Sequence, residues 1–383
     1  MAPLKIAITQ SNLTLRGGAE RVVLKVAQHY RAPIYVAEYD REGTFDEFGK
    51  LDVRVIPSAR LPLPYGRASQ GLRYGMAFRG LKLGDEFDMV NAHMAPSQWA
   101  SNRNDNVVWY CHTPLRDVYD LYHYRMSMRR WYARPLYAGA LRVVRSMDQG
   151  AVRRIGTIMA NSANVKRRIE RYYGRDDAIV VNGGVDYRNY RDRGDGRYFF
   201  YPSRISPNKR QDFAIEAFNM FSRRVKGYKL IILGPVSRDR AFADYYDYIK
   251  RLAASSPNRI EIMEGATDAE LSMLYSRCTA VLYPPINEDF GLVPLEAMAS
   301  GKPVIAADGA GPRETIAKGT GYLVKNPMQM SRRMESVTDR ELASRIGRVG
   351  RKRVVEHYSW GLFFKRFDAV LARAADGFRG SAR

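Results

Sequence analysis

Short apolar runs alternate along the chain with longer segments in which apolar and polar positions mix at helical spacing. The runs have the length of β-strands and occupy residues 4–9, 33–37, 53–56, 89–92, 107–111, 157–160, 178–181, 198–201, 229–233, 260–264, 280–283 and 304–307. Continuous apolar runs are typical of strands buried on both faces, and the helix-length segments between them are typical of crossover connections. The pattern therefore predicts an α/β fold whose parallel sheets are covered by helices.

The chain has 383 residues, more than one hydrophobic core usually supports, so two domains are expected. A polar, glycine-containing stretch at residues 187–197 interrupts the alternation and predicts a linker between domains at residues 1–186 and 198–359. Residues 360–383 contain a last amphipathic segment, which we expect to form a helix that packs back toward the N-terminal domain. Both domains are expected to be doubly wound and Rossmann-like, with ligands at the carboxyl ends of the strands in a central cleft.

The composition is strongly basic, with 62 Lys and Arg against 40 Asp and Glu, a formal net charge of +22 and a pI of about 10.0. Such an excess indicates an anionic partner: nucleic acid, an anionic lipid surface or a phosphorylated substrate. No apolar run reaches the roughly 18 residues of a membrane span, and the first run is too short for a signal peptide. The two cysteines fit no metal-ligand spacing, so we expect a cytoplasmic protein with free thiols.

The most informative stretch runs from Glu288 to Glu296, between the expected strand at residues 280–283 and an expected helix at residues 292–300. The start of that helix offers unpaired backbone N–H groups and a positive dipole end to an anion. The two carboxylates offer acceptors to neutral hydroxyl groups. Recognition of phosphate and of a polyol in one stretch points to a nucleotide sugar. The candidate contacts at the start of the helix are Phe290, Gly291 and Leu292.

Two further loops are candidates for phosphate binding. Gly17 and Gly18 join the first strand to a helix and would let the backbone approach a ligand closely; a plain connecting turn is the competing interpretation. Arg204 and Lys209 lie in the loop after the strand at residues 198–201. The guanidinium group can grip a diphosphate through two parallel hydrogen bonds, and the lysine can add a point charge. Basic loop residues are often merely solvated, but this loop follows a strand, where such sheets bind ligands.

Two histidines also follow strands: His112 comes after residues 107–111 and His93 after residues 89–92. A lone histidine is often structural, and of the two His112 is the preferred candidate for the cleft. A glycine-rich turn at residues 308–314 ranks below these candidates. The sequence holds no metal-ligand motif, no Gly-X-Ser-X-Gly elbow and no Gly-Lys-Ser/Thr phosphate loop. This argues against a metalloenzyme, a serine hydrolase and a common nucleoside triphosphatase, and we expect no metal and no other cofactor.

Taken together, these segments resemble the GT-B glycosyltransferases of the large retaining family 4 (glycosyltransferase group 1). The resemblance extends over Gly17-Gly18-Ala19-Glu20, Arg204 with Lys209, Glu288 with Glu296, and Gly319-Thr320-Gly321-Tyr322-Leu323. It implies that the N-terminal domain binds the acceptor and the C-terminal domain the nucleotide sugar. It further implies that Glu288 contacts sugar hydroxyls, that Glu296 binds the ribose and that Arg204 and Lys209 hold the diphosphate. In the same way it implies that His112 lies beside the reacting sugar carbon.

The segment Tyr110-Cys111-His112-Thr113-Pro114-Leu115-Arg116 is similar to the version found in mannosyltransferases that build lipid-linked glycans and O-antigens. This resemblance implies GDP-mannose as the donor and a polyprenyl- or dolichyl-phosphate-linked glycan as the acceptor. Such enzymes keep the anomeric configuration without an evident enzymic nucleophile, so the acceptor hydroxyl attacks from the face that the diphosphate leaves. A UDP-sugar donor, or a soluble acceptor as in synthases and phosphorylases, stays open as an alternative.

Basic residues of the N-terminal half are interleaved with Tyr124, Trp131, Tyr132, Leu136, Tyr137 and Leu141, a mixture that suits a helix resting on an anionic membrane. They are Arg125, Arg129, Arg130, Arg134, Arg142, Arg145, Arg153, Arg154, Lys166, Arg167, Arg168 and Arg171. We therefore expect a peripheral protein on the cytoplasmic face; a merely solvated basic surface is the alternative. A nucleic-acid-binding protein would share this charge, but no recognised RNA- or DNA-binding signature is present, and we expect no nucleic-acid partner.

Overall fold

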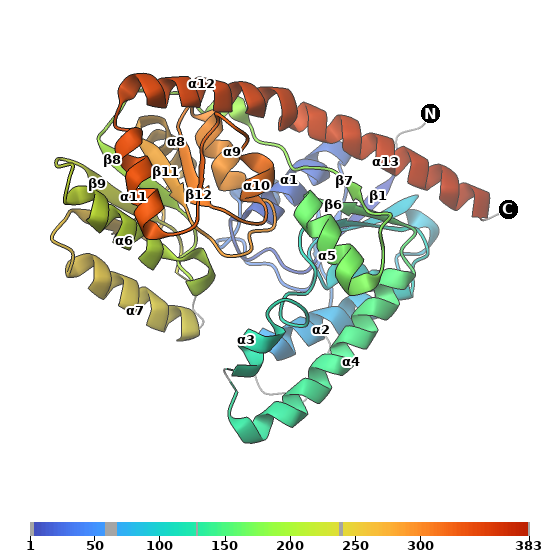
Figure 1. Ribbon diagram of the computed structural model, residues 1–383. Coiled ribbons are helices and arrows are strands. Elements are labelled where there is room, and N and C mark those ends of the chain that lie inside the picture. Colours follow the sequence, from blue (N-terminus) through green and yellow to red (C-terminus); the bar gives the residue numbers. More distant parts are fainter. Residues whose placement is uncertain (1–3, 58–66, 128, 237–239, 382–383) are drawn as a thin grey trace. The chain divides into compact units, whose positions relative to one another are not determined.

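The structure, a computed structural model, describes residues 4–57, 67–127, 129–236 and 240–381 (Figure 1). Its contacts divide the chain into two compact units. Unit 1 comprises Met1–Asn182 with Lys365–Arg383, and unit 2 comprises Gly183–Phe364. Each unit contains a parallel sheet connected through helices, so the predicted α/β fold with two Rossmann-like halves is confirmed.

Unit 1 is built on a seven-stranded sheet in the order β3-β2-β1-β4-β5-β6-β7, with every neighbouring pair parallel. The order reverses between β1 and β4, which is the type of switch point at which doubly wound sheets bind ligands. Its strands are β1 (Ile6–Gln10), β2 (Ile34–Val36), β3 (Val53–Val55), β4 (Met89–Ala92), β5 (Val107–Cys111), β6 (Thr157–Ala160) and β7 (Ile179–Val180). Its helices are α1 (Gly18–Tyr30), α2 (Arg67–Gly80), α3 (Tyr122–Ser127), α4 (Arg134–Arg153) and α5 (Ala163–Tyr173).

Unit 2 is built on a six-stranded parallel sheet in the order β10-β9-β8-β11-β12-β13, which reverses between β8 and β11. Its strands are β8 (Tyr198–Pro202), β9 (Lys229–Leu233), β10 (Ile260–Met263), β11 (Ala280–Tyr283), β12 (Val304–Ala307) and β13 (Tyr322–Val324). Its helices are α6 (Gln211–Ser222), α7 (Arg240–Ala254), α8 (Asp268–Arg277), α9 (Leu292–Ala299), α10 (Pro312–Thr315), α11 (Pro327–Ser336) and α12 (Arg340–His357). The last helix, α13 (Trp360–Ser381), begins in unit 2 and belongs to unit 1 from Lys365 onward.

The central strands are buried on both faces, as the continuous apolar runs predicted. Every residue of β8 and of β5 is buried. In unit 2 the ring of Phe199 meets that of Phe221 edge-on at 5.0 Å between centroids, and in unit 1 Trp109 is wholly buried. Such packing fixes the carboxyl ends of these strands, and therefore the first residues of the loops that follow them.

The expected strands all appear at or within two residues of their predicted bounds. One strand, β13, is not among them, because it has only three residues and two of these are half-buried. Residues 187–197, expected to form a linker, are packed against unit 2. Lys302 Nζ donates to Asp192 Oδ1 at 2.6 Å, and the backbone N–H of Arg193 donates to Ser276 O.

Candidate active site

The loops after β8 and β11 lie together because these two strands are neighbours at the switch point of unit 2. The backbone N–H of Ile286, after β11, donates to the carbonyl of Asn208, after β8, at 2.8 Å. The Tyr201 hydroxyl, on β8, donates to the carbonyl of Lys209. The first bond joins the two loops, and the second fixes the loop after β8 to its own strand.

Lys209 and Glu288 form an ion pair where these loops meet. Lys209 Nζ lies 2.5 Å from Glu288 Oε2 and 3.5 Å from the hydroxyl of Tyr283, the last residue of β11. Both charged side chains are more than four-fifths buried. Burial raises the pKa of the Tyr283 phenol well above its ordinary value, and Glu288 adds to this effect, so the phenol stays protonated. The structure thus brings together two of the predicted site residues, one cationic and one anionic.

Arg204 belongs to the same loop as Lys209, and its side chain is exposed. Its carbonyl accepts a hydrogen bond from Gln211 Nε2 at 3.1 Å, which fixes the backbone. Within the described part of the chain, its guanidinium group makes no hydrogen bond or ion pair. The backbone is therefore set while all five guanidinium N–H donors remain available to an anion.

The helix α9 starts directly after this site. Gly291, its N-cap, has φ +88°, a left-handed conformation that side chains rarely adopt, and no side chain caps the helix. Gly291 itself offers no side-chain acceptor to the first N–H groups of α9, and the start of a helix favours an anion. Phe290, in contrast, is 4% exposed and packs in the hydrophobic core of unit 2, with Leu292 half-buried against the same core. Only the backbone of Phe290 is suited to contact a ligand.

Glu296, on α9, has a different partner from Glu288. The hydroxyl of Tyr275, on α8, donates to Glu296 Oε2 at 2.6 Å. Burial raises the pKa of Tyr275 well above its ordinary value, so this phenol remains the donor and the carboxylate the acceptor. The remaining acceptor positions of the carboxylate are of the kind that bind a diol.

The glycine-rich turn at residues 308–314, the lowest-ranked of the candidate site segments, packs directly on the loop that carries Glu288. The N–H of Gly311 donates to the carbonyl of Glu288 at 2.9 Å, and a Cβ at Gly311 would lie 2.4 Å from the carbonyl oxygen of Phe290. This turn therefore supports the loop that carries Glu288.

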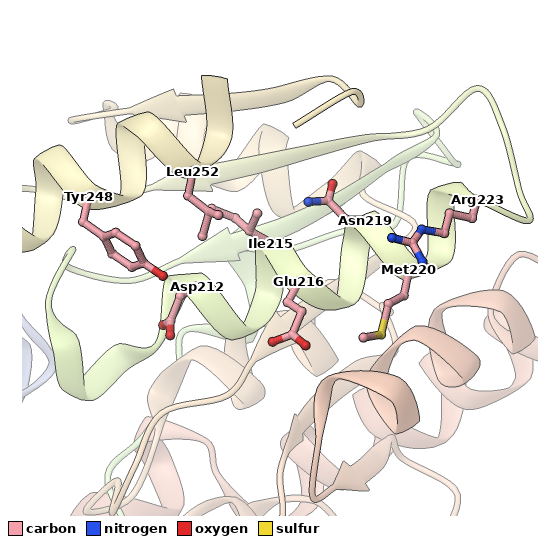
Figure 2. Close-up of a pocket in the computed structure, with 8 residues that line it drawn as sticks. All are labelled: Asp212, Ile215, Glu216, Asn219, Met220, Arg223, Tyr248 and Leu252. Carbon is pink, nitrogen blue, oxygen red and sulfur yellow. The ribbon is translucent and has the colours of Figure 1, made fainter. Parts of the chain in front are cut away.

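A groove of about 430 Å³ lies elsewhere in unit 2, between α6 and α7. Figure 2 shows Tyr248 and Leu252 of α7 above Ile215 of α6, with acidic side chains of α6 at its edge. None of the predicted site residues lines it.

In unit 1 the two histidines meet. His112 directly follows β5 and His93 directly follows β4, and these strands are parallel neighbours. His93 Nδ1 lies 3.0 Å from His112 Nε2, and His93 Nε2 lies 2.8 Å from Asn91 Oδ1. Burial lowers the pKa of His112 to about 3 and that of His93 well below its ordinary value, so both imidazoles are neutral. Asn91 was absent from the predicted site; its only signal was its place two residues before His93.

Gly17 and Gly18 mark the start of α1, where Gly17 is the N-cap in an extended conformation. A Cβ at Gly17 would lie 2.4 Å from the carboxylate of Glu20, whose side chain is buried in the first turn of the helix. The close approach of the Glu20 carboxylate therefore explains why residue 17 is a glycine. A role for Gly17 and Gly18 in phosphate binding stays a prediction.

In the described residues, no group of three or more His, Cys, Asp or Glu side chains is arranged to hold a metal ion. No described helix is long and apolar enough to cross a bilayer.

Comparisons with known proteins identify the family to which both halves of the chain are similar. A family model described as Glycosyltransferase Family 4 matches residues 16–189, and one described as Glycosyl transferases group 1 matches residues 187–353. The alpha-1,3/1,6-mannosyltransferase ALG2 of Mus musculus is 26% identical over 386 residues, which cover 91% of each chain. A GDP-mannose-dependent alpha-(1-6)-phosphatidylinositol monomannoside mannosyltransferase of Mycobacterium tuberculosis is 28% identical over 191 residues, 46% of each chain.

Solved structures share the fold. The Anabaena protein Alr3699/HepE, solved in complex with UDP and glucose, superposes with a TM-score of 0.73 at 18% identity and covers 96% of this chain and 99% of its own. The two family models follow one another along the chain, one for each half. The chain therefore belongs to the glycosyltransferases of family 4 and group 1, and its two Rossmann-like halves form the GT-B fold.

Proposed function

We propose that this glycosyltransferase moves mannose from GDP-mannose to a lipid-linked glycan, with retention of the anomeric configuration and without a metal ion. The observation that carries the proposal is the group of Lys209, Glu288 and the uncapped start of α9 at the switch point of unit 2. It offers a cation, a carboxylate and helix N–H donors in one place, which suits a phosphorylated sugar. Similarity to ALG2 over nine-tenths of the chain supports mannose and a glycan acceptor.

The diphosphate would be held by Arg204, Lys209 and the first N–H groups of α9. These donors stabilise the charge that develops on the leaving group, the task that a metal ion performs in other transferases. Phosphate oxygens would compete with Glu288 for Lys209, and the carboxylate so released would accept hydrogen bonds from sugar hydroxyls. Glu296, oriented by Tyr275, would accept those of the ribose.

The reaction balances without an enzymic nucleophile. The acceptor hydroxyl oxygen bonds to the anomeric carbon, and the bond from that carbon to the diphosphate oxygen breaks on the same face. The hydroxyl proton passes to the departing diphosphate, and GDP leaves. Catalysis then rests on positioning and on stabilising the departing charge, with His112 beside the reacting sugar.

The first test is thermal stabilisation by GDP-mannose, UDP-glucose, UDP-N-acetylglucosamine and ADP-glucose, each with and without EDTA. A ligand at about a hundred times its Kd adds roughly 2.7 kcal/mol, which a melting curve resolves. We expect a shift with GDP-mannose alone, unchanged by EDTA. A shift with UDP-glucose instead would identify UDP-glucose as the donor in place of GDP-mannose. Loss of the shift in EDTA would contradict metal independence.

The acceptor is tested by transfer of labelled mannose to a polyprenyl-diphosphate-linked glycan and to the same glycan without the lipid. Preference for the lipid-linked form is expected, and equal use of both would favour a soluble acceptor. If no nucleotide sugar binds, tighter binding to duplex DNA than to anionic vesicles, weakening steeply with salt, would establish the nucleic-acid alternative.

A basic aromatic face on unit 1 is suited to deliver this acceptor from a membrane. Within the segment from residue 129 to residue 143, Trp131 is 78% exposed and Leu136 82% exposed, and exposed apolar residues that lie together mark interaction sites. The exposed basic and large apolar residues of this segment, which together we call the basic aromatic face, are Arg129, Arg130, Trp131, Tyr132, Arg134, Leu136, Arg142 and Val143. Side chains of this kind bind at the interface of a bilayer, and the arginines add attraction to anionic headgroups.

Vesicle co-sedimentation tests this face. The double variant Trp131→Ser, Leu136→Ser should bind anionic vesicles about tenfold more weakly or worse, since two large apolar side chains no longer leave water. The matched control is Met328→Ser, an exposed apolar residue of α11 in unit 2, which should bind as the wild type does. Equal binding by both variants would contradict docking through this face.

A further inference from the structure

A chain of hydrogen bonds runs from a backbone carbonyl of β5 to His112, and each link fixes the next. The carbonyl of Val108 can only accept, so the group of Asn91 that faces it at 3.2 Å must be the amide NH₂. The amide oxygen of Asn91 then faces His93 Nε2 at 2.8 Å, so this ring nitrogen must carry a proton.

The neutral ring of His93 therefore has a bare Nδ1, and Nδ1 is the atom that faces His112 Nε2 at 3.0 Å. The proton between the two rings must come from His112. In a neutral imidazole this leaves a lone pair on the other nitrogen, His112 Nδ1. No hydrogen bond to that nitrogen is found in the part of the chain that the structure describes, and the residue retains 6% exposure.

We propose that Asn91 and His93 are positioning residues that hold His112 as its Nε2–H tautomer, with Nδ1 as the acceptor for a hydroxyl group of the sugar substrates. The identity of the hydroxyl rests on the proposed function, whereas the tautomer follows from the geometry of unit 1 alone. His112 then accepts a hydrogen bond from the substrate and does not donate one. It acts neither as an acid nor as a cation.

The opposite tautomer of His112 would set two lone pairs against each other at 3.0 Å. Relief would require the other tautomer of His93, then a flipped amide of Asn91, and finally an amide oxygen directed at the carbonyl of Val108. No member of the chain can turn alone, because burial removes water as a substitute partner. Protonation of both nitrogens of His112 is opposed by burial, which lowers its pKa to about 3.

The two rings are also held by their surroundings. The carbonyl of His93 accepts from Trp109 Nε1 at 3.0 Å, and its ring packs on that of Tyr110 at 5.5 Å between centroids. The carbonyl of His112 accepts from Asn161 Nδ2 at 3.0 Å. Backbone and ring are thus both fixed, which is what a hydrogen bond of defined direction to a substrate requires.

The tautomer is read directly by long-range ¹H–¹⁵N correlation spectroscopy of ligand-free protein labelled at its five histidines. Spectra of His93→Asn and His112→Asn assign the two rings by loss of their signals. We expect both rings to be neutral, each protonated at Nε2 only, and to stay so between pH 8 and pH 6. A proton on His112 Nδ1 at any pH in this range would overturn the inference, regardless of which sugar the enzyme transfers.

The positioning role is tested by a matched pair of variants. His93→Asn keeps an acceptor near the place of the ring nitrogen, since the amide oxygen reaches where Nδ1 lies, and His93→Leu removes the acceptor at similar volume. We expect His93→Leu to lower kcat/KM about tenfold, the scale of one hydrogen bond, and to release the tautomer of His112. His93→Asn should retain most of the activity and the Nε2–H tautomer of His112.

Equal loss of activity in both variants, with the tautomer of His112 unchanged, would overturn the positioning role. If His93→Leu does not fold, Asn91→Leu breaks the same chain one link earlier and is judged by the same two readouts. If the wild type transfers no sugar at all, the proposed function fails, and the spectrum of the ligand-free protein still decides the tautomer.

Discussion

Acid should destabilise unit 1 through the buried histidine pair. Burial lowers the pKa of His112 to about 3 and that of His93 well below its ordinary value, whereas both titrate near 6.5 in an unfolded chain. Below pH 6.5 both imidazoles bind protons in the unfolded chain but stay neutral in the folded protein. Because both pKa values are lowered by folding, their contribution is fully present above about pH 6.5 and is lost as the pH falls, for His112 down to about pH 3.

The magnitude follows from linkage. At pH 5.0 protonation of a histidine with an unfolded pKa near 6.5 stabilises the unfolded chain by about 2 kcal/mol. His112 alone therefore removes about 2 kcal/mol relative to pH 7.5, and His93 adds to the loss in the same direction. A typical domain has a free energy of unfolding of about 5–15 kcal/mol, so this loss is large. Hydrogen exchange of the amides of β4 and β5, corrected for intrinsic rates, measures it without assuming that both units unfold together.

Carboxylates also titrate in this range, so the comparison is between proteins. Between pH 7.5 and 5.0 the double variant His93→Asn, His112→Asn should lose less free energy of unfolding than the wild type, by at least about 2 kcal/mol. The control His123→Asn, a change in an exposed histidine of α3, should leave the acid-induced loss as it is in the wild type. If the wild type and the double variant lose the same free energy, the two imidazoles are not held neutral by burial, and the reasoning fails.

Three further changes test other parts of the structure. Arg204→Ala should lower turnover about a hundredfold or more, the scale of one preorganised donor to a developing charge, and near-wild-type turnover in a folded variant would refute the role. Asp148→Asn should destabilise unit 1 by about 2 kcal/mol, seen by hydrogen exchange, because the buried carboxylate accepts from Gln98, Trp99, Tyr119 and Tyr173. Gly311→Ala should lower both melting temperature and turnover, since its Cβ would meet backbone 2.4 Å away, whereas Gly309→Ala, with open space, should change neither.

The strands of this fold could be predicted because burial on both faces leaves a continuous apolar run. The run at β8 is aromatic throughout apart from its final proline, and that at β11 is wholly apolar. The same criterion misses β13, because a strand of three residues, two of them only half-buried, is too short to give a continuous buried run. The more deeply a strand is buried, the more clearly its position can therefore be predicted from the local sequence.

The site could be predicted residue by residue but not contact by contact. Lys209 and Glu288 were each expected in a segment that follows a strand. Their ion pair depends on β8 and β11 being neighbours, which no local pattern predicts. The bond between His93 and His112 arises in the same way from β4 and β5. For Phe290 the sequence predicted the position beside the site but not the direction of the side chain, which packs into the core of unit 2.

The charges that develop in the proposed reaction bear on the roles proposed for Arg204, Lys209 and His112. Unit 2 supplies Arg204, Lys209 and the start of α9, all suited to a leaving group that gains negative charge. The reacting carbon instead gains positive charge, and a cation placed beside it would raise the barrier by like-charge repulsion. A histidine held neutral, with a lone pair toward the substrate, avoids that repulsion and still accepts a hydrogen bond. In the proposed reaction the hydrogen-bond chain that begins at Val108 therefore matters for charge as much as for geometry, because it holds His112 as a neutral acceptor for the sugar substrate.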